Sequence, residues 1–208
     1  MKRLDDAISA AGCAAYVAYA SSKDADFRYL TQFQVSDPLL YVKRLGEEPG
    51  LVVPQMEYAR AAAEATAVPV TRAESGYLAY LDEDKEPWKA LAHTAAALAG
   101  GPVLVPGTLP YRLGRLLEGY GEVVVDTNGA VGAMRAVKTS HELAAIRAAQ
   151  RATAAAMDLG IAMIRRSSAK DGVLVLDGEP LTSERVKAAM HISLMLSLIH
   201  ISEPTRPY

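Results

Sequence analysis

The apolar positions in the first half of the chain alternate between helical and strand-like spacing. Leu4, Ala7, Ile8 and Ala11 repeat at the interval of one helix face and predict a helix over residues 4–15. Short apolar runs predict strands at residues 16–20, 39–42, 51–53, 68–70, 103–105 and 123–125. Helical patterns lie between them at residues 56–65, 76–98 (interrupted near Pro87) and 111–120. This alternation predicts an α/β fold with helices flanking a sheet.

One connection in this half predicts that the sheet is mixed. Residues 46–50, GEEPG, have the composition of a tight turn and lie between the strands at 39–42 and 51–53. A turn this short can join only antiparallel neighbours. We therefore expect a mixed sheet rather than a wholly parallel one.

The second half begins at a polar, glycine-rich segment, TNGAVG, at residues 127–132. It predicts a domain boundary, with the first domain over residues 1–131. Arg135 and Lys138 are interpreted as closing an extended connector before a helix over residues 140–164. Thr139 or Ser140 can cap that helix, because Glu142 stands at the capping-box spacing from Thr139. GVLVLDG, at 172–178, predicts a short hairpin, and a second helix begins at Thr182 or Ser183.

The end of the chain differs in character from the rest. An uncharged apolar run, ISLMLSLIHIS, leads into the proline-punctuated EPTRPY, and it is shorter than the roughly 20 residues that span a bilayer. The string LSLIHISEPTR at residues 196–206 resembles a translated sequencing adapter. We therefore expect the biological sequence to stop near Met195 and residues 196–208 to be an artefact. The alternative is a natural buried strand followed by a disordered tail.

Composition narrows the classes of function. Half of the residues are hydrophobic, and 22 basic against 24 acidic residues give a net charge of −2 without a basic stripe. Nucleic acid is therefore not an expected partner. The single cysteine, Cys13, is predicted to be a small buried hydrophobe, and it excludes a disulfide within the chain. Acidic residues interrupt the N-terminus before any signal-peptide core, so we expect a cytoplasmic protein without a membrane segment.

Several segments together resemble one known family. Residues 134–150, MRAVKTSHELAAIRAAQ, resemble the entry to the catalytic domain of the creatinase/prolidase/Xaa-Pro aminopeptidase family. Residues 24–33, DADFRYLTQF, are similar to that family's Asn-x-x-Tyr-Leu-Thr-Gly-Phe element, with Asp26 near the usual Asn and Gln32 replacing the usual Gly. Val53–Pro54 and the helix MEYARAAAEA follow in the family's order. The ordered match covers roughly residues 1–195.

This resemblance implies a fold and an activity for an intact parent protein. It implies a creatinase/prolidase-type N-terminal domain, then the truncated start of a pita-bread catalytic domain over residues 132–195. The parent would be a metal-dependent Xaa-Pro peptidase, of aminopeptidase P or prolidase type, that hydrolyses the bond before proline. Two Asp, one His and two Glu would hold two divalent ions (Mn, Co or Zn), and all five are expected after Met195. A proline-containing peptide substrate and a homodimer are the implied partners.

For the fragment itself, we expect no catalytic, cofactor-binding or metal residue and no activity. Two alternatives remain for the parent. One is a creatinase-like amidinohydrolase, which uses the same fold without metal. The other is a non-catalytic binding module of that fold.

Residues with potential chemistry have simpler structural interpretations. The histidines lack the i, i+4 spacing of a helical metal site and are expected at the surface or in the core. Asp171 and Asp177 are expected in hairpin turns, and residues 82–86, DEDKE, in a solvated loop. Gly100–Gly101 precedes a strand, so it is not expected to be a phosphate-binding loop. A role in capping the following helix is sufficient to explain Ser140. The histidines are His93, His141, His191 and His200.

Three aromatic residues leave two possibilities open. Tyr77, Tyr80 and Trp88 are close in sequence, with partly helical spacing. Aromatic residues at such spacing are usually core. In assembled members of the family that the sequence resembles, however, the N-terminal domain of one subunit can approach the active site of another. These side chains could then help to close a substrate pocket.

Overall fold

The computed structural model of the chain describes residues 2–199, so His200 and the tail from position 200 lie outside the described residues. The chain divides into two compact units, Met1–Val137 and Lys138 onward. They are described separately.

A six-stranded sheet forms the centre of the first unit. Its order is β4-β3-β2-β1-β5-β6. Only β2 is antiparallel to its neighbours, β1 and β3, whereas the other pairs are parallel. The mixed sheet and its β2–β3 hairpin confirm the prediction. The strands are β1 (Ala15–Ala20), β2 (Leu39–Arg44), β3 (Gly50–Val53), β4 (Val68–Thr71), β5 (Val103–Pro106) and β6 (Val123–Asp126).

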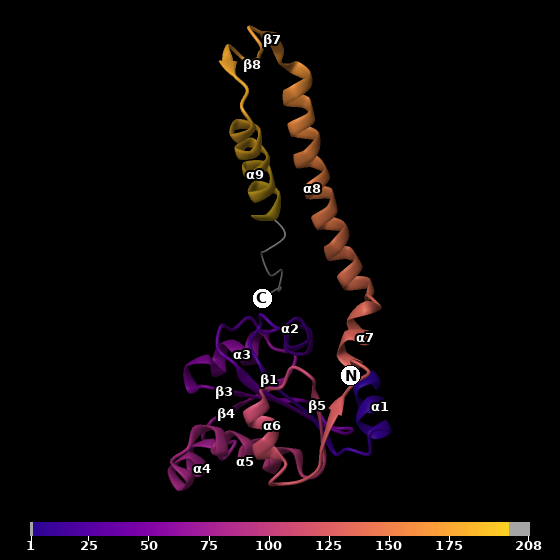
Figure 1. Cartoon of the computed structure of the whole chain (residues 1–208), viewed down its shortest axis with the longest axis vertical. Helices are drawn as coiled ribbons and strands as arrows, with labels where there is room; N and C mark the ends of the chain where they lie inside the picture. The colour runs from indigo at the N-terminus through magenta and orange to yellow at the C-terminus, as the bar shows by residue number, and fades with distance from the viewer. Residues whose placement is uncertain (1, 200–208) are drawn as a thin grey trace. The chain divides into compact units, whose positions relative to one another are not determined.

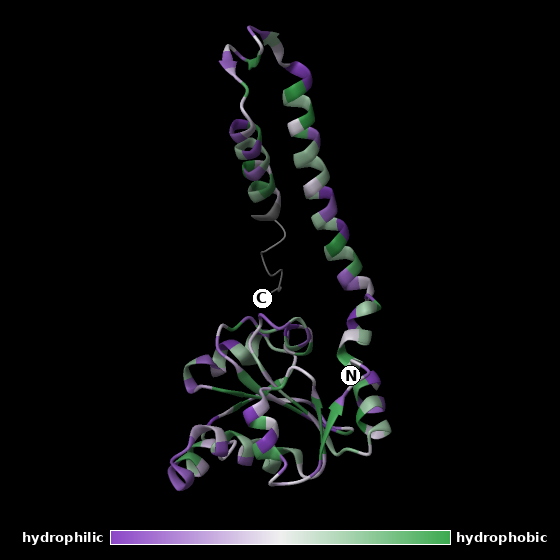
Figure 2. Cartoon of the chain, viewed as in Figure 1, coloured by the Kyte–Doolittle hydropathy of each residue, from purple (hydrophilic) through white to green (hydrophobic). Residues whose placement is uncertain are grey.

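Helices cover both faces of this sheet (Figure 1). They are α1 (Lys2–Ala10), α2 (Ala25–Thr31), the 3-10 turn η1 (Gln55–Glu57), α3 (Tyr58–Glu64), α4 (Tyr77–Asp84), α5 (Pro87–Ala99), α6 (Tyr111–Leu117) and α7 (Ala130–Ala136). On one face α1, α2 and α7 bury Ile8, Phe27 and Met134 against the strands. On the other, α5 and α6 bury Leu91 and Leu113. Figure 2 shows the resulting apolar strands between helices with hydrophilic outer positions.

Two predicted boundaries in this unit need correction. The helix predicted over residues 4–15 ends at Ala10, because Gly12 has a φ of 67° and β1 begins at Ala15. The segment predicted as a polar break and extended connector instead contains α7. The N-cap residue is Gly129, and Asp126, three positions earlier, caps the helix start from outside. Its carboxylate accepts hydrogen bonds from the backbone N–H groups of residues 128, 129 and 130 at 3.0, 2.9 and 2.7 Å, the last being the first residue of α7.

The backbone at the end of α2 shows why glycine suits the position where this chain departs from the family motif. Asp24 caps the start of this helix through the N–H groups of residues 26 and 27, each at 2.9 Å. Gln32 ends it in the left-handed region, at φ 51° and ψ 14°. This backbone conformation favours glycine, because any Cβ crowds the following carbonyl oxygen. A glycine in the family motif therefore fits the backbone geometry at position 32 better than glutamine does.

Gln32→Gly is expected to raise the free energy of unfolding by about 0.5–1 kcal/mol. The removal of left-handed strain outweighs the loss of the side-chain hydrogen bond to the Tyr29 carbonyl, because that bond is exposed. Urea unfolding followed by fluorescence measures the change. Gln34→Gly is the matched control, since Gln34 is exposed and has no positive φ. It should lower stability, and an equal loss at position 32 would contradict the prediction.

The second unit is a pair of helices joined by a small sheet. Its elements are α8 (Ser140–Arg166), β7 (Ser168–Lys170), β8 (Val173–Leu176), β9 (Glu179–Pro180) and α9 (Ser183–Ile199). Thr139, not Ser140, is the cap of α8, and it forms the reciprocal capping box with Glu142. Ala152, Ala156 and Gly160 are buried at four-residue intervals, and a Cβ on Gly160 would meet the Met190 side chain of α9.

The apolar run near the end of the described chain is helical, not a strand. The α9 helix continues through it to Ile199, and Ile192, Met195 and Leu196 are exposed. Within the described residues, no helix combines the length and hydropathy needed to cross a membrane.

Candidate functional site

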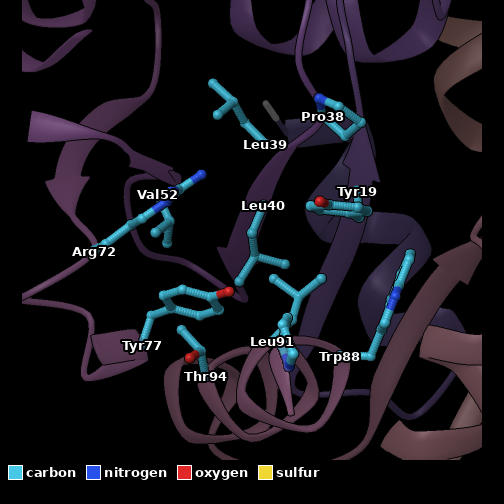
Figure 3. A pocket seen from close by; sticks show the side chains of 11 residues that line it. Tyr19, Pro38, Leu39, Leu40, Val52, Arg72, Tyr77, Trp88, Leu91 and Thr94 are labelled. Atoms are coloured by element: carbon cyan, nitrogen blue, oxygen red, sulfur yellow. The ribbon is translucent and has the colours of Figure 1, made fainter. Parts of the chain in front are cut away.

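A cavity of about 200 Å³ opens at the carboxyl edge of the first unit's sheet. We call it the carboxyl-edge pocket. Its lining residues are Tyr19, Pro38, Leu39, Leu40, Val52, Arg72, Tyr77, Pro87, Trp88, Leu91 and Thr94 (Figure 3). In α/β sheets, side chains from different strands converge at this edge, where ligand sites commonly lie.

The topology places these side chains together. Tyr19 is the penultimate residue of β1, and Arg72 directly follows β4, three positions across in the sheet order. The α4 and α5 helices then close the side of the pocket with residues of their first turns, Tyr77 and Trp88. Thr94 lies in the wall of α5, where its hydroxyl donates to the Ala90 carbonyl at 2.7 Å. The Thr94 hydroxyl hydrogen is therefore engaged within α5 and is not free to donate to a ligand.

Two contacts hold the Trp88 ring. It meets the ring of Tyr19 edge to face, with centroids 5.9 Å apart and planes at 72°. The Arg112 guanidinium carbon lies 5.8 Å from the centre of the Trp88 ring, and this arginine pairs with Glu86 at 3.1 Å. Glu86 also caps α5 by accepting from the N–H groups of Trp88 and Lys89. The aromatic wall is thus held by packing and by the helix cap.

Besides the Thr94 hydroxyl and the Trp88 indole N–H, the polar groups of the pocket are the Arg72 guanidinium and the hydroxyls of Tyr19 and Tyr77. The Arg72 guanidinium carbon lies 5.7 Å from the centre of the Tyr77 ring. Burial raises the pKa of Tyr19; nearby Tyr77 and Asp37 add to this rise, while the positive charge of Arg72 opposes it. Tyr19 therefore stays a neutral hydroxyl at neutral pH. The site combines an apolar interior with one cation and two tyrosine hydroxyls.

The aromatic trio considered in the sequence is divided by the structure. Tyr77 and Trp88 both line the carboxyl-edge pocket. Tyr80 instead stacks on His93, with centroids 3.6 Å apart, and His93 stacks on Tyr120 at 5.0 Å. His93 is therefore the middle ring of an aromatic stack.

The acidic residues near the same sheet edge have structural roles. Asp24 and Asp126 cap α2 and α7, as described above. Asp26 forms an ion pair with Arg135 at 2.7 Å, 109 positions along the chain. This contact joins the two segments that carry the family resemblance, DADFRYLTQF and the start of MRAVKTSHELAAIRAAQ. Across the described residues, no group of three or more His, Cys, Asp or Glu side chains could hold a metal ion.

The remaining candidates are turn, cap or surface residues. Asp171 and Asp177 occupy hairpin turns with φ of 50° and 57°, each followed by a glycine with positive φ. His141 and His191 are exposed on α8 and α9. The segment predicted as a solvated loop, DEDKE, is helical as far as Asp84, because α4 continues to that residue.

Two further candidates lie at the ends of helices. Gly100 ends α5 with a φ of 71°, and a Cβ on Gly101 would lie 2.9 Å from that of Ala14. Both glycines therefore have structural roles: Gly100 ends a helix in the left-handed conformation, and Gly101 lets the backbone pass close to the Ala14 side chain. Cys13 follows α1 and is buried, and burial raises the pKa of its thiol.

Tyr19 and Arg72 were not singled out by sequence. The available signal was positional, since each stands at or just beyond the carboxyl end of a predicted strand. That signal applied equally to other strand ends. The strand order, which a local pattern does not give, was needed to select these two.

Comparison with known proteins is consistent with this architecture. The model of the creatinase/prolidase N-terminal domain matches residues 1–137. No curated protein matches the chain in sequence.

Three similar solved structures are peptidases. They are the prolidase of Pyrococcus horikoshii OT3 (16% identity, 94% of this chain and 48% of that one, TM-score 0.61), the dipeptidase PepE of Mycobacterium ulcerans (17%, 94% and 49%, 0.59) and the X-Pro aminopeptidase of Thermotoga maritima MSB8 (14%, 92% and 49%, 0.63). At these identities the likeness concerns the fold, and the chain spans about half the length of each structure. With the family model covering residues 1–137, this chain belongs to the creatinase/prolidase N-terminal domain family.

Proposed function

We propose that this chain is the N-terminal part of a metal-dependent Xaa-Pro peptidase of prolidase or aminopeptidase P type. The observation that carries the proposal is the family match over residues 1–137, followed by a helical pair that the fold likeness to prolidases also covers. The parent enzyme would hydrolyse the bond before proline in the cytoplasm, as a homodimer. Neither the creatinase-like nor the binding-module alternative gains a specific supporting observation.

The chemistry of the parent would lie outside this chain. Two divalent ions, when bound, would activate a water and polarise the scissile carbonyl. The residues described here do not fit such a pair, because the carboxylates nearest the sheet edge are engaged as caps or in an ion pair. We therefore assign no catalytic step to any residue of this chain, and propose that the 208-residue protein is inactive by itself.

The second unit supports the assignment to a larger protein. Several large apolar side chains of α8 are exposed, among them Leu143, Ile146, Ile161 and Ile164. Figure 2 shows apolar patches along this helix. Water-exposed apolar surface of this extent is typical of a face that packs against further protein. The proposed partner is the rest of the catalytic domain.

The first test is to assay the purified chain with Mn²⁺ against Ala-Pro and Ala-Pro-Ala, with an authentic prolidase and an authentic Xaa-Pro aminopeptidase in parallel. We expect no cleavage before proline above the blank. Manganese-dependent hydrolysis that co-purifies with the chain would overturn the proposed inactivity.

The second test is to read the source DNA through the codon for Met195. We expect a continuous frame that encodes two Asp, one His and two Glu at ligand positions, and a full product that loses Xaa-Pro hydrolysis on EDTA treatment. A frame that reads LSLIHISEPTRPY and then stops would contradict the peptidase assignment.

A further inference from the structure

The carboxyl-edge pocket combines a large aromatic wall with polar groups that the fold does not use. In the part of the chain that the structure describes, no hydrogen bond or ion pair engages the side chains of Arg72, Tyr19 or Tyr77; the contact of Arg72 with the Tyr77 ring is a cation–π contact. Figure 3 shows these side chains arranged around the cavity, with Leu40 and Leu91 near the middle of the group and Trp88 at one side.

Arg72 differs in this respect from several other arginines of the same unit. Arg112, Arg60 and Arg135 each pair with a carboxylate, at 3.1, 2.6 and 2.7 Å. Arg72 presents a planar fork of donors beside a cavity and has no such carboxylate among the described residues. A guanidinium in this setting matches a carboxylate, which can accept two parallel hydrogen bonds.

The size of the cavity limits the apolar part of a ligand. A cavity on the order of 150 Å³ holds a benzene ring in a protein core. The carboxyl-edge pocket, at about 200 Å³, therefore has room for one ring and a short polar substituent. A peptide of several residues exceeds this volume.

We propose that the carboxyl-edge pocket binds a small monocarboxylate that carries one apolar ring. The ring packs between Trp88, Leu40 and Leu91, and the carboxylate accepts hydrogen bonds from Arg72. The Tyr19 and Tyr77 hydroxyls are further donors. Because the pocket lies wholly within the first unit, this proposal is independent of the proposed peptidase activity.

One nearby charge opposes the anion. Asp37 is exposed and acts electrostatically on Tyr19. A carboxylate ligand therefore meets attraction from Arg72 and weaker repulsion from Asp37. This gives the proposal a second signature, since removal of the Asp37 charge should tighten binding of the acid but not of a neutral analogue.

Trp88 makes the test direct, because it is the single tryptophan of the chain. Its fluorescence should change saturably when phenylacetate is titrated into the full chain. The neutral analogue 2-phenylethanol, with the same ring, should bind about tenfold more weakly, which is the effect of one charge-assisted contact. Saturation-transfer NMR on the same mixtures provides a readout that does not depend on Trp88.

Three variants distinguish the contribution of the Arg72 side chain to ligand binding from the effect of the protein's net charge. Arg72→Gln should weaken phenylacetate binding about tenfold and leave 2-phenylethanol unchanged, and Asp37→Asn should strengthen phenylacetate binding alone. Arg3→Gln removes an equal charge from the exposed surface of α1 and should change neither. The proposal is overturned by an absence of saturable binding in both measurements, by equal affinity for acid and alcohol, or by an Arg72→Gln protein that binds phenylacetate normally. Circular dichroism confirms that each variant is folded.

Discussion

Replacing Asp5 with asparagine is expected to lower the free energy of unfolding by about 3 kcal/mol. Lys43 lies in β2 with only 1% of its surface exposed, and its ammonium group contacts the Asp5 carboxylate at 2.6 Å. Among the described residues, its other hydrogen-bond partner is the Arg44 carbonyl at 2.8 Å. Asparagine leaves a buried positive charge without a counterion. Urea unfolding monitored through Trp88 fluorescence measures the loss in the unit concerned.

Two further variants make this result specific. Asp6→Asn, on the same helix but exposed and outside any ion pair described here, should change stability by less than about 0.5 kcal/mol. Lys43→Met should cost little, within about 1 kcal/mol, because it removes the buried charge itself. If Asp5→Asn and Asp6→Asn had equal effects, the buried ion pair would not stabilise the fold.

The same pair predicts a pH dependence with a definite sign. Partial burial raises the pKa of Asp5, but the hydrogen bonds from Lys43 and the Gly46 backbone, together with the Lys43 charge, outweigh it and leave the pKa lowered. A carboxyl whose folded pKa lies below its unfolded value stabilises the fold above the unfolded value, near 4, and loses this contribution as pH falls through the folded pKa. The wild-type and Asp5→Asn proteins should therefore converge in stability below about pH 4.

Gly101→Ala is expected to lower stability by about 1–3 kcal/mol through overpacking. Its new Cβ would lie 2.9 Å from the Cβ of Ala14, an atom with no side-chain freedom to move away. The backbone N–H of Ala14 donates to the Pro102 carbonyl at 2.7 Å, so this junction of β1 and β5 has little room to shift. Chemical denaturation again measures the change.

A second substitution and a second glycine distinguish overpacking from other effects. Ala14→Gly in the same protein should restore much of the stability, because it removes the opposing Cβ. Gly107→Ala is the matched control, with no atom within 4 Å of the added Cβ and no positive φ; it should be neutral or stabilising by about 0.5 kcal/mol. A failure of Ala14→Gly to rescue would show that the cost arises elsewhere.

The sequence predicted helices where the apolar repeat continued over several turns, and it predicted strands where β-branched residues were concentrated. The hairpin between β2 and β3 and the capping box at Thr139 are local features, and their sequence signatures were sufficient. The α7 helix was missed because its cap, Asp126, belongs to the preceding strand, and its glycine-rich start has the composition of a linker.

The pocket and the ion pairs depended on information that a local pattern does not contain. Arg72 and Tyr19 meet because β4 lies three strands from β1, and Asp26 meets Arg135 across 109 positions. The burial of Lys43 within an apolar strand is likewise decided by α1, which brings Asp5 to it. Only two of the three aromatic residues named from sequence face the pocket, because Tyr80 lies on the side of α4 that stacks on His93.

The central position of β1 has a consequence for the order in which the first unit forms on the ribosome. One edge of β1 pairs with β2 soon after both are made, but its other edge pairs with β5, Ala15 opposite Val103. At roughly 5–20 residues per second, synthesis of the intervening segment takes on the order of 5–20 s. During that interval a largely buried strand of the finished sheet presents unpaired backbone groups and an apolar surface. The nascent chain is therefore a natural client for chaperones until β5 emerges.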